Sequence, residues 1–189
     1  MVPLLLPLAL FALQSPVLTS EMWPGEGIPH FVANTTTLDL YAEPSRATQR
    51  HRLFANVGAG LEFDDTRFIT IRPGHVVARK RGAMSGRVFG GISYLSKTLY
   101  DSNALPTTQI AYVPGDTLEY LQNRAEGTCI IRAREDVVEV DNCPAGDHEA
   151  FTTLEEPQTE WWIHVNLSKT MQGWLLVDPK AVRELSRTF

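Results

Sequence analysis

The sequence predicts an all-β protein, and three observations point to this fold class. Clusters rich in glycine, proline and aspartate, which favour turns, recur at intervals of about eight to twelve residues. Between them polar and apolar residues alternate, as in residues 36–41, which is the pattern of a strand with one buried face. Stretches with the period of an amphipathic helix, about 3.6 residues, are nearly absent.

The expected strands fall into two series along the chain. The first contains residues 36–41, 52–57, 61–63, 67–72 and 75–80. The second contains residues 109–113, 117–122 (a strand or a short helical turn), a hairpin within 128–143, and a closing hairpin of 161–166 and 172–178. The tail, residues 180–189, is expected to form a short helix or a closing strand.

A polar cluster with a proline, residues 101–106, separates the two series and is typical of a linker. We therefore expect two small domains, residues 36–105 and residues 106–189. An irregular lead-in rich in proline and glycine, residues 21–35, precedes them. Domains of this size have thin cores, so a covalent cross-link would add useful stability.

Two cysteines, Cys129 and Cys143, lie within one candidate hairpin. A turn near Glu135 and Asp136 makes the hairpin symmetric about residue 136 and places the two cysteines opposite each other. Opposed residues at non-hydrogen-bonded sites have Cβ atoms close enough for a disulfide. We expect this bridge in an oxidising compartment, where a loop of about 15 residues contributes roughly 3 kcal/mol. Two reduced thiols are the alternative, and a metal site is less favoured because no histidine lies at ligand spacing.

Residues 1–20 differ in composition from the rest of the chain. Residues 2–13 are almost wholly apolar, and no charged side chain occurs before Glu21. The apolar run is shorter than the roughly 20 residues that span a bilayer, but it matches the central region of a secretory signal peptide. We expect cleavage before Ser20 or Glu21, a periplasmic or extracellular location, and no membrane span in the mature chain. The alternative is a buried N-terminal core segment, because the usual Lys or Arg at the start is missing.

Charge and residue spacing argue against several function classes. The formal net charge is −5, and the densest basic run is residues 79–81, so a phosphate backbone would repel the chain and no nucleic-acid partner is expected. The five histidines are scattered, with no pair at metal-ligand spacing. No Gly-x-Ser-x-Gly motif or phosphate loop is present, and the acidic stretch near Glu155 and Glu160 is interpreted as solvated surface. We expect no metal, no cofactor and no catalytic residue.

The last expected hairpin carries a recognisable motif. Residues 161–165 (WWIHV) followed by 172–178 (QGWLLVD) resemble the closing strands of SH3-type barrels, including bacterial SH3b domains. Residues 37–45 (TLDLYAEPS) and 58–60 (GAG) resemble the opening of an SH3b module. The resemblance implies two SH3-like β-barrels in tandem, with the cysteine hairpin in the second. Residues 177–179 (VDP) stand where eukaryotic SH3 domains carry Pro-Ser-Asn-Tyr, so recognition of proline motifs is not implied.

Trp161 and Trp162 are adjacent on an expected strand, so their side chains face opposite sides of the sheet. One ring enters the core, and the other lies at the surface or in a groove, where it is a candidate contact point. The SH3 resemblance implies that Trp161 is the groove residue; the alternative is that a neighbouring domain or the C-terminal tail covers it. Trp174 is expected in the core because Gly173 permits close strand approach. Tyr41, Trp161, Trp162 and Trp174 form the candidate binding set.

These observations favour an exported, non-catalytic binding or scaffold module. It would recognise a protein or a peptidoglycan peptide through aromatic side chains. A second hypothesis is an inhibitor of a secreted hydrolase that presents a rigid loop at residues 143–148. A third is an enzyme whose site assembles only in space.

Overall fold

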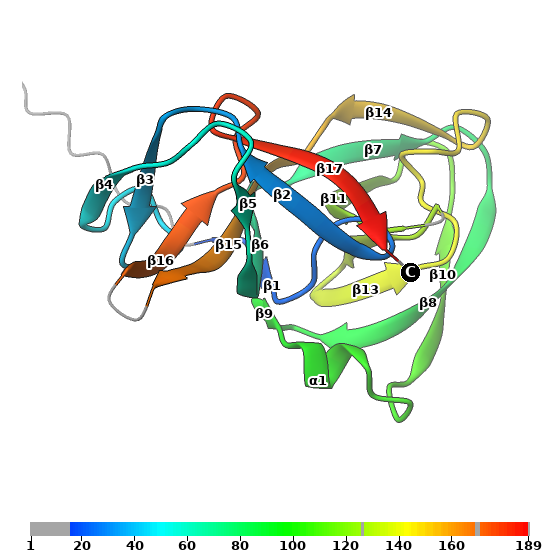
Figure 1. The fold of residues 1–189 in the computed structure, drawn as a ribbon. Helices are drawn as coiled ribbons and strands as arrows, with labels where there is room; N and C mark the ends of the chain where they lie inside the picture. The colour runs from blue at the N-terminus through cyan, green and yellow to red at the C-terminus, as the bar shows by residue number, and fades with distance from the viewer. Residues whose placement is uncertain (1–15, 126, 169–170, 189) are drawn as a thin grey trace, which may run out of the picture.

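The computed structural model describes residues 16–125, 127–168 and 171–188. These residues form seventeen β-strands and one four-residue helix, α1 (Lys97–Tyr100). The all-β prediction is therefore confirmed. The strands make three sheets that build two lobes, shown at the left and the right of Figure 1.

Sheet 1 is the large sheet of the first lobe, and all but one of its strand pairs are antiparallel. The exception is the parallel pair of its last two strands. In spatial order the strands are β4 (Arg50–Phe54), β3 (Thr37–Tyr41), β16 (Met171–Leu176), β15 (Gln158–Ser168), β6 (Phe63–Arg72), β1 (Leu18–Ser20) and β9 (Tyr94–Leu95).

Sheet 3 covers one face of sheet 1 and completes the core of the first lobe. Its strands are β17 (Val182–Thr188), β2 (Ile28–Ala33) and β5 (Gly60–Leu61). Phe31 and Val182 from sheet 3 pack against Leu38, Ile163 and Leu175 from sheet 1. The sequence allowed a short helix or a closing strand for the tail, residues 180–189. The structure shows the closing strand, β17.

The expectation of an irregular lead-in at residues 21–35 is wrong for its second half, because β2 lies there. The turn signals around Pro29 obscured the short apolar run that follows it. Pro29 is tolerated because β5 pairs only with Phe31 and Val32, so no strand lies on the β5 side of the proline. Phe31 and Val32 are buried in the core of the first lobe.

Sheet 2 forms the second lobe, and all its strand pairs are antiparallel. The sheet curls around a core that contains Val76, Leu118, Ile131 and Val138. In spatial order its strands are β10 (Thr107–Tyr112), β8 (Gly82–Gly90), β13 (Asp136–Val140), β12 (Cys129–Ala133), β11 (Thr117–Asn123), β7 (Gly74–Ala78) and β14 (Phe151–Glu155). Residues 82–90 and 151–155 were not among the expected strands.

Neither large sheet closes into a barrel, so the expected pair of tandem SH3-like barrels is not what the sheets form. In sheet 2 the end strands β10 and β14 are not hydrogen-bonded to each other. They approach through the rings of Tyr112 and Phe151, whose centroids lie 4.7 Å apart. The second lobe is therefore an open, curled sheet (Figure 1).

One two-stranded ribbon runs through both lobes. Strand β6 continues into β7 across Pro73, and β14 continues into β15 across Pro157. The pairing is kept on both sides of these breaks, with Gln158 opposite Arg72 in sheet 1 and Glu155 opposite His75 in sheet 2. As a result, each large sheet contains strands from both residues 36–105 and residues 106–189, and neither range forms a sheet of its own.

A third core holds the two lobes together. Leu18 and Leu95 from sheet 1 pack against Leu121, Ile130 and Val137 from sheet 2. Across the same interface, the Thr70 hydroxyl donates to the Leu121 carbonyl at 2.9 Å. The Gln122 side-chain amide donates to the Phe68 carbonyl, also at 2.9 Å.

The position of the N-terminal strand β1 argues against the cleavage site expected at the end of residues 1–20. Leu18 is 0% exposed and Ser20 is buried, and β1 pairs with both β6 and β9. Cleavage before Ser20 or Glu21 would remove Leu18 from the interface between the lobes. Residues 1–15, which carry most of the apolar run, lie outside the described residues.

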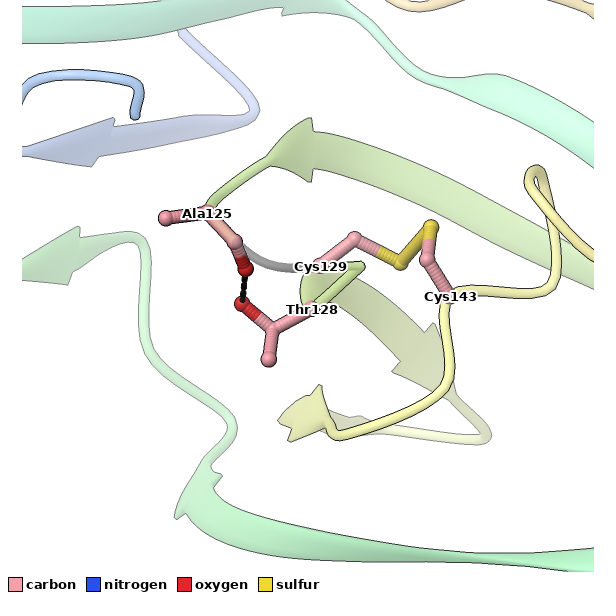
Figure 2. Close-up of a disulfide and its surroundings, with 4 residues drawn as sticks. All are labelled: Ala125, Thr128, Cys129 and Cys143. Atoms are coloured by element: carbon pink, nitrogen blue, oxygen red, sulfur yellow. Dashed lines mark hydrogen bonds between the residues drawn. A yellow bond between two sulfur atoms is a disulfide. The ribbon is translucent and has the colours of Figure 1, made fainter. Parts of the chain in front are cut away.

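The predicted disulfide between Cys129 and Cys143 is confirmed, with Cα atoms 5.2 Å apart (Figure 2). The expected register is wrong, because the turn lies at Arg134 and Glu135 and Cys129 is opposite Val140. After β13 the chain stays beside the segment that precedes β12, where the Cys143 N–H donates to the Gly127 carbonyl at 2.7 Å. The bridge thus joins the start of β12 to the loop that follows β13.

Candidate functional site

The aromatic residues nominated from the sequence divide between the two faces of sheet 1. Tyr41, Trp162 and Trp174 lie together on the face away from sheet 3, in a cluster that includes Ile69. Trp162 is fully buried there, with its ring edge-on to Tyr41 at 5.2 Å, and Trp174 is also buried. These three residues fill a small core and do not line an open groove.

Trp161 lies on the opposite face, toward sheet 3, and is half-buried. Its ring packs edge-on against Phe31 at 5.1 Å, and its Nε1–H donates to the Thr66 hydroxyl at 2.8 Å. Arg187 of β17 places its guanidinium carbon 5.9 Å from the centre of the ring. The C-terminal strand therefore covers part of Trp161, as one of the two alternatives anticipated.

A cavity of about 260 Å³ remains beside Trp161, and we call it the Trp161 pocket. Leu176 and Pro179 line it together with Trp161. Its rim carries an ion pair, because Arg46 Nε lies 2.6 Å from Glu160 Oε1. Asp178 also lines the pocket, which therefore combines apolar groups with one cation and two carboxylates.

Local hydrogen bonds hold the residues of this pocket in place. The Trp162 indole N–H donates to Glu160 Oε2 at 3.0 Å, so the carboxylate is held between Trp162 and Arg46. The Val177 N–H donates to the Trp161 carbonyl at 2.8 Å. The Pro179 carbonyl accepts from the Asn34 side-chain amide, also at 2.8 Å.

Two residues of the pocket rim were not found from the sequence. Glu160 belongs to the stretch that was interpreted as solvated acidic surface. Arg46 lies in the turn after β3 and precedes its partner by 114 positions, so no local pattern connects them. The only sequence signal for this part of the pocket was that Glu160 directly precedes Trp161.

A second polar cluster lies beside Trp174. His164 Nδ1 lies 2.7 Å from Asp64 Oδ1, and the Asn166 side-chain amide donates to the other carboxylate oxygen at 2.5 Å. The hydrogen bond with His164 holds the pKa of Asp64 below its usual value. No hydroxyl or thiol among the described residues is hydrogen-bonded to His164.

The N-terminal segment makes a third group of polar contacts, which Glu21 forms with Tyr94 and Lys97. The Tyr94 hydroxyl donates to Glu21 Oε1 at 2.6 Å, and the Lys97 N–H donates to Glu21 Oε2 at 2.8 Å. Burial, together with this bond to Glu21, raises the pKa of Tyr94 to about 12. The bond from Tyr94 is the main cause that lowers the pKa of Glu21. These contacts tie the chain after β1 to β9 and α1.

The curled sheet 2 contains two larger cavities. One, of about 450 Å³, lies between β10 and the turn that joins β12 to β13. The other, of about 560 Å³, lies near the disulfide and borders Tyr112, Cys143 and Phe151. Tyr112 borders both cavities.

The loop at residues 143–148, which the inhibitor hypothesis invokes, is anchored at both ends. Cys143 is held by the disulfide, whose other half follows Thr128; the Thr128 hydroxyl donates to the Ala125 carbonyl at 2.6 Å (Figure 2). At the far end, the Asp147 carboxylate accepts the N–H groups of Glu149 and Ala150.

In residues 16–125, 127–168 and 171–188, no three His, Cys, Asp or Glu side chains are grouped to hold a metal ion. No helix in that part of the chain has the length and apolar composition needed to cross a membrane.

Comparison of the chain with protein-family models, with curated proteins and with solved structures finds no match.

Proposed function

We propose that this chain is an exported, non-catalytic binding protein that holds a short peptide in the Trp161 pocket. The observation that carries the proposal is the pocket that Trp161, Leu176 and Pro179 line, with the Arg46–Glu160 pair at its rim. Apolar contact with Leu176 and Pro179 contributes affinity, and the Arg46 cation beside the carboxylates of Glu160 and Asp178 orients a charged peptide. The partner is a protein segment or the stem peptide of a bacterial cell wall.

The SH3-like part of the proposal applies to the first lobe alone. Support comes from the hairpin of β15 and β16, where His164 pairs with Trp174 and so aligns the two halves of the motif. Gly173 supports it further, because a Cβ there would lie 3.0 Å from the Tyr41 carbonyl oxygen and would press β3 away. The second lobe then enters the chain between β6 and β15 as an insertion.

Export is supported by the disulfide, which persists in oxidising compartments such as the periplasm and the extracellular space. Because Leu18 is part of the core between the lobes, we place any cleavage before it, in contrast to the expected site at residue 20.

Binding to purified cell-wall sacculi tests the proposal. Wild-type protein should bind intact sacculi, and amidase-treated sacculi without stem peptides should bind less. Arg46→Ala should weaken binding about tenfold by removing the rim cation. Trp161→Phe should weaken binding by a similar factor because the ring contact shrinks.

A matched control is Arg52→Ala, since Arg52 and Arg46 have the same side-chain exposure of 61% and each pairs with a carboxylate. Arg52 is outside the pocket, so this variant should bind as wild type does. Binding by none of the proteins would contradict the cell-wall version of the proposal. Equal binding by all of them would show that the Trp161 pocket is not the site.

A further inference from the structure

The cavity near β10 borders the core of sheet 2. Its apolar wall contains Val88, Leu118 and Val138, and the last two are buried. A volume of about 450 Å³ is within the range of pockets that hold a drug-sized group. The rest of its lining mixes apolar and polar residues of β10 with three charged ones, Asp116, Arg134 and Asp136. The Asp116 carboxylate already accepts the Val113 N–H at 2.8 Å.

The hydrogen bonds of β10 show which of its backbone groups face the cavity. The Val88 N–H donates to the Pro106 carbonyl at 2.8 Å, which places residues 106 and 88 at a hydrogen-bonded position. Bonded and non-bonded positions alternate in an antiparallel pair. The backbone groups of Thr108, Ile110 and Tyr112 therefore point to β8, and those of Gln109 and Ala111 point away from it. We call this outward side of Gln109 and Ala111 the β10 edge.

The β10 edge is not covered by another strand. Among the described residues β10 pairs only with β8, and the contact with β14 is confined to Tyr112 at its end. The side chains of Gln109 and Ala111 are exposed on the outer surface, yet both residues border the cavity, so their backbone lines it. Proteins commonly protect edge strands with Lys, Pro or a bulge, and β10 (TTQIAY) contains none of these.

Arg134 at the cavity mouth provides an independent observation. It occupies the turn between β12 and β13 with φ of 60°, a left-handed conformation that favours glycine or asparagine in such turns. Its side chain is exposed, and no hydrogen bond or ion pair joins it to another described residue. A charged side chain held at an unfavourable backbone position points to a role for that charge.

We propose that the β10 edge accepts an extended peptide as an eighth strand of sheet 2. Main-chain hydrogen bonds to Gln109 and Ala111 supply affinity, and alternate side chains supply specificity. One apolar side chain of the peptide enters the cavity, and an acidic residue or terminal carboxylate meets Arg134. This site lies on a different sheet from the Trp161 pocket and does not depend on it.

A displayed library of random dodecapeptides, selected on the purified full chain, provides the probe. Recovered peptides should alternate apolar and polar residues and carry an acidic group. With such a peptide bound, the amide hydrogens of Gln109 and Ala111 should exchange more slowly than in the free protein. Exchange at these two positions is a direct readout of strand addition.

Two pairs of variants separate the backbone contact from the charge contact. Gln109→Pro removes the outward N–H and should lower affinity about tenfold or more, while Gln109→Ala keeps that donor and should bind as wild type does. Arg134→Gly should lower affinity about tenfold and at the same time raise the melting temperature, because glycine relaxes the turn. Arg81→Asn removes an exposed arginine that does not line the cavity and should change neither property.

Several results would overturn the proposal. These are failure to recover any peptide, equal affinity of Gln109→Pro and Gln109→Ala, or unchanged amide exchange at Gln109 and Ala111. A concentration-dependent dimer abolished by Gln109→Pro would identify a second copy of this chain as the occupant. The Trp161→Phe variant should keep its affinity for the peptide that binds the β10 edge. Failure of the β10-edge proposal can therefore be told apart from failure of the Trp161-pocket proposal.

Discussion

At the scale of single residues, Tyr120 links burial to pH dependence. It lies in the core of sheet 2, and burial is the main reason that its pKa is raised to about 12, with the charge of Glu156 adding to the effect. The unfolded chain ionises its tyrosines near pH 10. Below that pH both states hold the proton, so the stability associated with this group is complete. It is lost as the pH rises from about 10 toward 12, because only the unfolded state ionises there.

We therefore predict that Tyr120→Phe makes the protein less sensitive to alkali. A shift of about two pKa units corresponds to roughly 3 kcal/mol of unfolding free energy, of which roughly 2 kcal/mol is lost by about pH 12. Between about pH 9 and about pH 12, wild type should lose that much more free energy than the variant does, as measured by urea denaturation. Equal losses in the two proteins would contradict this assignment. Tyr94 serves as a comparison with Tyr120. Its pKa is also raised to about 12, but its side chain is more exposed to solvent than that of Tyr120.

At the scale of elements, the ribbon through both lobes depends on a close approach at its two breaks. Gly74 follows Pro73 at the start of β7, and a Cβ there would lie 2.6 Å from the Pro157 nitrogen and 2.8 Å from the Glu156 carbonyl carbon. Both neighbours are backbone atoms, which cannot move aside as a flexible side chain can. The absence of a side chain at residue 74 therefore allows the two bent strands to stay paired across the junction.

Gly74→Ala should destabilise the fold by roughly 1 to 3 kcal/mol, because one of the bent strands must shift. Chemical denaturation of the two proteins measures this difference. Gly60→Ala is the matched control, because Gly60 also lies in a strand and a methyl group added there would meet no atom within 4 Å. That variant should be neutral or slightly stabilising. Similar effects of the two substitutions would argue against steric contact as the cause.

At the scale of the whole molecule, the chain order and the sheet order do not coincide. Strands β7 and β8 from the first half belong to sheet 2, and β15 and β16 from the second half belong to sheet 1. Removing either half takes strands out of both sheets and exposes backbone groups that need partners. The core between the lobes, with Leu18 and Leu121, adds a further shared contact.

We predict that separately expressed residues 36–105 and 106–189 do not fold. Each fragment should lack the dispersed amide resonances that the full chain shows, because each would lose the strands that cover its core. A folded fragment 106–189 with the Cys129–Cys143 bridge would contradict this and would support the domain boundary that the sequence predicts.

The N-terminal strand gives a second prediction at this scale. A chain that begins at Glu21 lacks β1 and leaves the Leu18 site in the core empty. Loss of one buried leucine costs about 2 to 5 kcal/mol, so this chain should melt at a lower temperature than one that begins at Pro16. Equal melting temperatures would show that β1 does not contribute to the core. In a secreted protein, mass spectrometry should find the mature terminus before Leu18.

The sequence by itself determined the features that depend on neighbouring residues. Alternation with a period of two identified most strands, and it required Trp161 and Trp162 to point to opposite faces of one sheet. Two cysteines in one hairpin were sufficient to identify the Cys129–Cys143 bridge. The turn signals also marked the ends of most strands, although Pro29 concealed β2.

Only the tertiary structure decided which strands meet, because pairing depends on cores assembled from distant segments. The contact of Arg46 with Glu160 and the pairing of β6 with β15 each join segments about a hundred residues apart, for which local periodicity carries no information. The same holds for the register of Cys129, which lies opposite Val140 because the turn forms at Arg134 and Glu135. Alternation sets which face a side chain takes, whereas packing and long-range hydrogen bonds set its neighbours.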